Sequence, residues 1–210
     1  LDGDGDRVII IDEKGNVLNG EEIIFIFAKH YLNEKKIQKG SILVTNEVAN
    51  HGLDIALNKL GLKLKRVKVG DKNILKEILD NKYFFGGEPS GHFIFKDDIL
   101  IGDGMATAIR LLTLILKEKK KLSVLRNGIN LLEELNINQR IDRERFYLNQ
   151  ESIYKKLNIL LKNLDIYYNI RPSGTEPLLR VNLQYHKRNI KVNTLKKLNK
   201  QIIKVISDAC

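Results

Sequence analysis

The chain has 210 residues, a formal net charge of +10, 43% hydrophobic residues and 30% charged residues. This composition excludes a disordered chain of low hydrophobicity and high charge, and no apolar stretch approaches the roughly 18 residues that argue for a membrane span. We therefore expect a globular protein with no membrane partner. Its one cysteine, Cys210, cannot form an internal disulfide, which fits a cytoplasmic location.

The positive charge raises the possibility of a nucleic-acid partner, because clustered Lys and Arg neutralise phosphates. Much of the excess is Lys scattered over predicted helix faces, for example at positions 117 and 119–121, near one helix end where cations favour the helix dipole. No groove-reading motif accompanies it. We expect no nucleic-acid partner, and a non-catalytic basic nucleic-acid-binding module remains the alternative from a different functional class.

An acidic, glycine-rich loop opens the chain. Its residues are Asp2-Gly3-Asp4-Gly5-Asp6-Arg7, followed by the apolar run 8–11. Three carboxylates at alternate positions can converge on one hard cation if the backbone folds tightly between them, and glycine permits that fold. A solvated turn is compatible with the same residues. A calcium loop of the helix–loop–helix kind is disfavoured, because Arg7 stands at the sixth position, where the sharp turn needs glycine.

Helices and strands are predicted to alternate over residues 18–125. Helices are predicted at 23–31, with a capping box of Asn19 and Glu22, and at 49–60, 73–79 and 104–118; strands are predicted at 41–45, 63–69, 83–85 and 93–95. This alternation indicates an α/β domain with a mixed, mostly parallel sheet and flanking helices. We interpret residues 1–17 as the carboxy-terminal end of a truncated α/β domain that carries the acidic loop.

A second loop, Gly86-Gly87-Glu88-Pro89-Ser90-Gly91-His92, joins two of the predicted strands. The Glu88 carboxylate can accept hydrogen bonds from a pair of hydroxyls or pair with an ammonium, and Ser90 and His92 supply short, orientable hydrogen bonds. Such a loop suits a sugar. Ordinary turn residues ahead of a strand are the competing explanation.

The pattern loosens over residues 122–136 into a short helix and a polar connection, which we take as a domain boundary. Beyond it the order is strand, helix, strand, strand, helix. The last four are predicted at 152–164, 165–170, 178–184 and a terminal helix whose one face carries Leu195, Leu198, Ile202 and Val205. Residues 126–210 are thus predicted to form a small α+β domain with an antiparallel sheet.

A third loop, Arg171-Pro172-Ser173-Gly174-Thr175-Glu176-Pro177, joins two of these strands. Ser173, Gly174 and Thr175 offer hydroxyls and backbone N–H groups that can surround an anion. Arg171 adds a two-pronged cation suited to a phosphate dianion. The sequence therefore predicts a phosphate site here, although a plain turn uses the same residue types.

The three loops, in this order, closely resemble those of the alpha-D-phosphohexomutases, and within that family the bacterial phosphoglucosamine mutases. Two further stretches, 69–71 and 102–104, fall where the family carries similar residues, and we predict that Asp103 caps the helix that follows it. The chain departs from the pattern at Lys72, where the glucosamine branch tends to have Arg, and at Ile101, where Thr is usual.

The resemblance implies an isomerase that moves a phosphoryl group between the 6- and 1-oxygens of a hexosamine phosphate, through a phosphoserine and a bisphosphate intermediate, on the route to UDP-N-acetylglucosamine and the cell wall. It implies Mg2+ on Asp2, Asp4 and Asp6, with Arg7 acting on the transferring group. By the same resemblance, Glu88 and Ser90 hold sugar hydroxyls, with His92 a further candidate. The phosphate that does not react is expected on Arg171, Ser173, Gly174 and Thr175.

The family's nucleophilic serine lies in an amino-terminal domain that has no counterpart in this sequence. We therefore expect this chain to be a carboxy-terminal fragment, inactive alone, whose partners are the missing amino-terminal domains of the same enzyme. Pro89 favours the glucosamine branch, since Met or Leu is commoner there in the mannose and glucose branch. A phosphomannomutase/phosphoglucomutase is the alternative enzyme.

Overall fold

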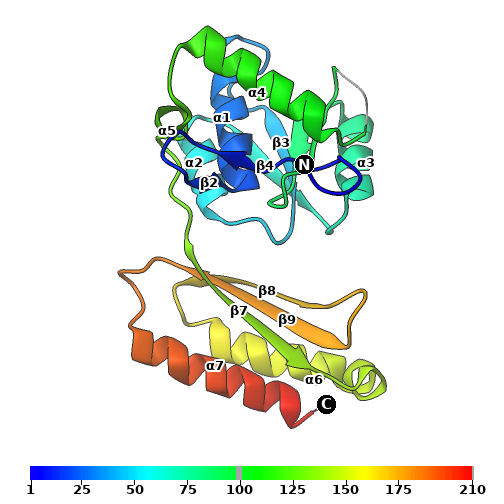
Figure 1. Ribbon diagram of the computed structural model, residues 1–210. Helices are drawn as coiled ribbons and strands as arrows, with labels where there is room; N and C mark the ends of the chain where they lie inside the picture. The colour runs from blue at the N-terminus through cyan, green and yellow to red at the C-terminus, as the bar shows by residue number, and fades with distance from the viewer. Residues whose placement is uncertain (98–100, 210) are drawn as a thin grey trace. The chain divides into compact units, whose positions relative to one another are not determined.

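The computed structural model describes residues 1–97 and 101–209; residues 98–100 and Cys210 lie outside the described residues. The chain divides into two compact units, one from Leu1 to Leu131 and one from Leu132 to the end (Figure 1). Ile129 belongs to the first core, although it lies beyond the predicted boundary at 125/126. Among the described residues, no helix is long and apolar enough to cross a membrane.

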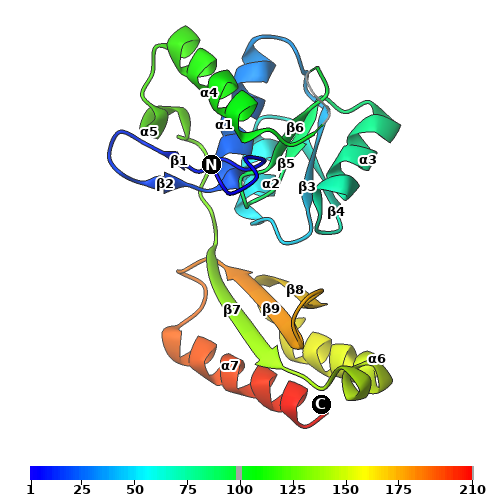
Figure 2. The same cartoon turned by 45° about the vertical axis from the view of Figure 1, so that its right-hand side comes forward.

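The first unit is built on a four-stranded sheet with the order β4-β3-β5-β6 (Figure 2). The strands are β3 (Ile42–Asn46), β4 (Lys63–Val67), β5 (Phe85–Gly87) and β6 (Phe93–Phe95). Strand β3 is parallel to β4 and β5, and β6 is antiparallel to β5. The predicted mixed, mostly parallel sheet is therefore confirmed.

Helices and a small hairpin surround this sheet. The helices are α1 (Gly20–Asn33), α2 (Gly52–Lys59), α3 (Asp71–Asn81), α4 (Gly104–Glu118) and α5 (Leu122–Leu125), and the hairpin pairs β1 (Ile10–Ile11) with β2 (Val17–Leu18). The observed bounds of α4 are those predicted. Helix α1 begins at the predicted capping box, where Glu22 Oε2 accepts a hydrogen bond of 2.9 Å from Asn19 N.

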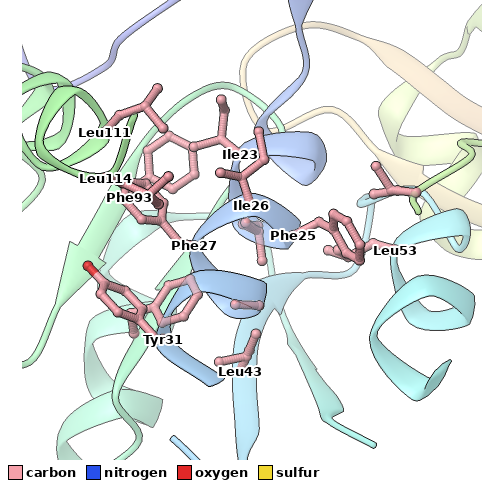
Figure 3. Close-up of a cluster of buried hydrophobic side chains, with 14 of the residues drawn as sticks. Ile23, Phe25, Ile26, Phe27, Tyr31, Leu43, Leu53, Phe93, Leu111 and Leu114 are labelled. Carbon is pink, nitrogen blue, oxygen red and sulfur yellow. The ribbon is translucent and has the colours of Figure 1, made fainter. Parts of the chain in front are cut away.

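The main core of this unit forms around α1, which is apolar on nearly every side (Figure 3). Phe27 meets Phe95 of β6 edge-on, with ring centroids 5.1 Å apart, and stacks on Tyr31 of its own helix. Leu111 and Leu114 of α4 belong to the same cluster. A helix that is hydrophobic all round is expected to be buried, and the sheet and α4 supply the two surfaces that bury it.

Helix α3 covers the other face of the sheet. Ile74 and Ile78 pack with Val44, whereas the neighbouring Leu43 points into the core around α1. Successive side chains of a strand point to opposite faces, so β3 is buried on both sides and has a continuous apolar run. Gly86 of β5 has no room for a side chain: a Cβ there would be 2.7 Å from Val44 O of the neighbouring strand and 2.9 Å from Ile74 Cγ2 of α3.

The second unit is a three-stranded antiparallel sheet with two helices on one face. Its elements are β7 (Glu133–Arg140), α6 (Arg143–Leu161), β8 (Ile166–Pro172), β9 (Leu178–Tyr185) and α7 (Val192–Ser207), with strand order β7-β9-β8. The predicted α+β class is confirmed. Residues 133–136, predicted to be a polar connection, belong to β7, because Leu135 and Ile137 alternate into the core.

Helix α6 begins well before the predicted start at residue 152. Asp142 caps it, since Oδ1 accepts a hydrogen bond of 3.0 Å from Arg145 N, and Phe146 in its first turn is fully buried. In the sequence, the polar residues 149–152 separate this first part from the apolar pattern of the rest of the helix. Tertiary packing of Phe146 extends the helix beyond what its local pattern predicts.

Candidate functional site

The acidic loop brings its three carboxylates together. One oxygen from each of Asp2, Asp4 and Asp6 lies within 4.8 Å of the others, with Asp2 and Asp4 exposed. Gly5 has φ +76°, a conformation that glycine adopts freely. The oxygens of an octahedral Mg2+ site lie about 2.9 Å apart along an edge, given metal–oxygen distances of about 2.05 Å. Three carboxylates this close together offer the hard oxygen donors that such an ion prefers, so the residues present fit it.

Arg7 holds two of these carboxylates. Its backbone N–H donates to Asp2 Oδ1 at 3.1 Å, and its Nε lies 2.8 Å from Asp2 Oδ2 and 3.3 Å from Asp6 Oδ1. Partial loss of hydration acts to raise the pKa of Asp2, but the Arg7 amide and guanidinium outweigh it and the pKa is lowered. The hydrogen bond to Asp6 and the charge of Asp2 raise the pKa of Arg7.

Two later segments anchor the acidic loop. Arg7 and His92 form an isolated antiparallel bridge, and His92 Nδ1 lies 3.2 Å from Asp6 Oδ2. At the start of α4, Gly104 N donates to Gly5 O at 2.9 Å. Asp103 caps α4 as predicted, because its Oδ1 accepts from a backbone N–H of the first turn.

His92 is buried, with a side-chain exposure of 5%. Its ring packs against Gly102, where a Cβ would lie 2.0 Å from both Cε1 and Nε2. The sequence suggested that His92 contacts a sugar. In the structure its Nδ1 faces a carboxylate of the acidic loop, so the side chain links the first loop to the second.

The second loop follows β5, at the edge of the sheet where the parallel strands β3, β4 and β5 all end. Ligands of open α/β sheets bind at the carboxyl ends of the strands. Glu88 is half-buried there and Ser90 is exposed. Ser90 Oγ lies 3.4 Å from Glu88 Oε2, so the two predicted sugar ligands face the same region.

Two neighbours of Glu88 were not among the predicted site residues. Asn46, the last residue of β3, donates from Nδ2 to Glu88 Oε1 at 2.9 Å, and the backbone N–H of Gly70 donates to the same oxygen at 3.2 Å. A polar residue at the carboxyl end of a buried apolar strand was the available signal for Asn46. That both of them bind Glu88 could be recognised only from the folded structure.

The third loop lies in the second unit, between β8 and β9. Ser173 is buried, its N–H donates to Leu178 O at 2.8 Å, and its Oγ accepts from Glu176 N at 3.4 Å. These bonds close a tight turn. Gly174 and Thr175 are exposed at its tip, and nothing lies within 4 Å of a Cβ built on Gly174. The tip therefore offers open backbone N–H groups that an anion can approach.

Arg180 of β9 lies directly opposite Arg171 of β8 in the strand register. Residues opposite each other share one face of the sheet, and like charges in such pairs repel. Arg180 Nη2 donates to Glu176 Oε2 at 2.7 Å, which offsets part of this repulsion, and its Nε is buried with no hydrogen-bond partner among the described residues. Two guanidinium groups on one face favour an anion beside the third loop.

The family model described as "Phosphoglucomutase/phosphomannomutase, alpha/beta/alpha domain III" matches residues 19–131. A phosphoglucosamine mutase of Clostridium botulinum (strain Hall) is 41% identical over 188 residues, which are 88% of this chain and 42% of that protein. A phosphoglucosamine mutase of Ruminiclostridium cellulolyticum is 38% identical over 206 residues, 94% of this chain and 45% of that protein. The chain thus spans less than half the length of these curated relatives.

Solved structures share the fold. Aspergillus fumigatus N-acetylphosphoglucosamine mutase in complex with GlcNAc-6P and magnesium has a TM-score of 0.78 at 17% identity, over 98% of this chain and 51% of that chain. A phosphoglucomutase/phosphomannomutase family protein from Burkholderia thailandensis has a TM-score of 0.74 at 20% identity, over 100% of this chain and 46% of that chain. The chain therefore belongs to the phosphoglucomutase/phosphomannomutase family, with its alpha/beta/alpha domain III at residues 19–131.

Proposed function

We propose that the full-length protein containing this chain is a phosphoglucosamine mutase, which interconverts glucosamine 6-phosphate and glucosamine 1-phosphate in the cytoplasm. The observation that carries the proposal is the 3.2 Å contact of His92 Nδ1 with Asp6 Oδ2, because it joins the acidic loop to the loop of Glu88 in one structure. Relatives at 38–41% identity that bear this name support the substrate.

Asp2, Asp4 and Asp6 would hold Mg2+, since carboxylate oxygens are the donors this ion prefers. When bound, the ion would neutralise charge that builds on a transferring phosphoryl group. Arg7 keeps two of the carboxylates in place, and its guanidinium carries further N–H groups that suit a phosphoryl oxygen.

Glu88 and Ser90 would bind sugar hydroxyls at the carboxyl ends of the parallel strands. Arg171, Ser173, Gly174 and Thr175 would bind the phosphate that stays on the sugar, and binding energy from that remote group would orient the reacting end. We add Arg180 to this set, because it shares a sheet face with Arg171.

We propose that the reaction needs the rest of the full-length protein, including the phosphoserine that the family resemblance implies. The family's loop is of the Ser-His-Asn-Pro type, and none of Ser41, Ser90, Ser123, Ser152, Ser173 and Ser207 is followed by His-Asn-Pro. The chain alone is accordingly proposed to bind Mg2+ and phosphate without turnover. Mutase activity of the isolated chain, above a metal-free control, would refute this.

The test is an assay of the purified full-length protein with Mg2+ and glucosamine 6-phosphate, followed by 31P NMR. We expect the glucosamine 1-phosphate signal to appear, and to be lost in Asp4→Asn. Mannose and glucose phosphates are assayed in parallel. Faster turnover of either would favour a phosphomannomutase/phosphoglucomutase, and no isomerisation of any of the three would reject the proposal.

Metal binding has a readout that needs no turnover. Titration calorimetry of the 210-residue chain with MgCl2 is expected to show one site that Asp4→Asn abolishes. Asp165→Asn is the control, since Asp165 lies in the second unit, away from the acidic loop in the sequence. Equal Mg2+ affinity in all three proteins would show that the acidic loop does not bind the ion.

A further inference from the structure

The carboxylate of Glu88 has two different oxygens in this fold. Oε1 accepts two hydrogen bonds, from Asn46 Nδ2 at 2.9 Å and from Gly70 N at 3.2 Å. Oε2 has the longer contact with Ser90 Oγ, at 3.4 Å. A carboxylate oxygen has about two lone-pair directions, so both directions of Oε1 are taken. The oxygen with free accepting capacity is Oε2, on the side of the exposed Ser90.

Asn46 is itself held in one orientation. It is 3% exposed, and its Oδ1 accepts a hydrogen bond of 3.2 Å from Val48 N. The two ends of an amide side chain are distinguished by their partners. With Oδ1 committed to a donor, Nδ2 faces the Glu88 carboxylate as a donor. The orientation of Asn46 therefore sets the orientation of Glu88.

The second donor is fixed by the backbone. Gly70 has φ +122°, in the region that L side chains rarely adopt, and stands at the amino end of α3. Asn73 Nδ2 donates to Val69 O at 3.1 Å, which ties down the loop that carries the Gly70 N–H. Both donors thus come from strand ends or helix starts rather than from the loop of Glu88.

We propose that Asn46 is a positioning residue: together with the Gly70 N–H it binds Oε1 of Glu88, so that Oε2 alone is presented to a sugar hydroxyl. The identity of the ligand rests on the proposed function; the orientation of Glu88 does not. The alternative is that Asn46 only connects the ends of β3 and β5 and has no effect on ligand binding.

The discriminating variants exchange donor and acceptor in the full-length protein. Asn46→Asp keeps the shape of the side chain and the acceptor for Val48 N, but places a carboxylate against Glu88. Glu88→Gln alone removes the charge that the sugar hydroxyl meets. In the double variant the amide introduced at position 88 can donate to the carboxylate introduced at position 46, so a hydrogen bond in the reverse direction replaces the charge repulsion, while the Gly70 N–H loses its acceptor.

The expected result is a coupled effect. Asn46→Asp should raise KM for glucosamine 6-phosphate by about tenfold to a hundredfold, because hydrogen bonds to charged groups contribute about 1.5–3 kcal/mol. It should change kcat less, since the contact serves binding. In the Glu88→Gln background the same substitution should raise KM by a factor that is at least about tenfold smaller, because the effects of two residues in contact are not additive.

The control is Asn19→Asp, which adds the same charge near the same loop. Asn19 caps α1 through its backbone and side-chain oxygen, and Asp is an equally good cap, so this change should leave KM unaltered. Thermal unfolding of each variant identifies any that fails to fold. Additive effects of Asn46→Asp and Glu88→Gln on KM would overturn the proposal.

A structural readout separates this inference from the proposed function. Crystal structures of the 210-residue chain and of its Asn46→Asp variant should show the Glu88 carboxylate turned away from residue 46 in the variant. A carboxylate that keeps its place overturns the positioning role even if the full-length protein proves to be an active mutase. A displaced carboxylate in a protein without mutase activity would reject the proposed function and keep the inference.

Discussion

His92 Nδ1 and Asp6 Oδ2 are 3.2 Å apart, although one residue follows β5 and the other precedes β1. Nδ1 is the atom of the buried imidazole ring that faces this carboxylate. The contact restricts the side chain of Asp6, while Arg7 restricts that of Asp2. Residues that orient metal-binding side chains in this way affect metal affinity although they do not touch the ion.

The first prediction concerns this contact. His92→Phe keeps an aromatic ring in the buried position and removes the ring nitrogen that faces Asp6. We expect Mg2+ affinity of the isolated chain to fall about tenfold or more, the size seen when such supporting groups are lost. Calorimetric titration measures it. His186→Phe, in the second unit, is the control, and an equal affinity of all three proteins for Mg2+ would contradict the role of His92.

Gly102 should tolerate no side chain. A Cβ at this position would lie 2.0 Å from two atoms of the His92 ring. Gly102→Ala should therefore lower the free energy of unfolding by about 1–3 kcal/mol, as overpacked sites do. The matched control is Gly3→Ala, because nothing lies within 4 Å of a Cβ there. Thermal unfolding followed by circular dichroism compares the two, and equal melting temperatures would show that the ring moves aside freely.

Arg171 is expected to bind phosphate through two parallel N–H groups. Arg171→Lys keeps the charge and loses that geometry, so affinity for inorganic phosphate should fall about tenfold. The measurement is 31P NMR titration of the isolated chain. Arg188→Lys makes the same exchange at an exposed position between β9 and α7. If the two variants weaken binding equally, the general positive charge and not the third loop attracts the anion.

Glu118 should make stability depend on pH in acid. Its pKa is lowered from the ordinary value of 4.5, first by the hydrogen bond from His30 and then by that from Lys120. A lowered pKa in the folded state contributes stability above pH 4.5, and this contribution is lost as the pH falls through the lower value.

The variant Glu118→Gln removes this titration. Its melting temperature should therefore fall less steeply than that of the parent between about pH 6 and pH 3. Glu151→Gln, at an exposed position of α6, is the control for loss of a carboxylate. Parallel curves for parent and Glu118→Gln would show that the His30 contact does not contribute.

Local signals in the sequence determined where a helix begins when its capping residues are all present. The capping box at Asn19 and the capping residue Asp103 predicted the starts of α1 and α4, because a cap needs only residues within one turn. The start of α6 was missed. Its first turn is polar except for Phe146. The burial of Phe146 in the core of the second unit stabilises this turn as helix, and the local sequence does not show that burial.

The sequence by itself determined which residues we propose for the chemistry: alternate aspartates between glycines, a Glu and Ser in a glycine-rich loop, and an Arg beside a turn of small residues. Their types and spacings are local properties of the chain. Tertiary structure decided their partners. Asn46 contacts Glu88 because β3 and β5 are neighbours in the sheet. His92 contacts Asp6 because Arg7 forms a β-bridge with His92 just before β6. Strand order depends on how whole elements bury their apolar faces, so no local pattern could supply these contacts.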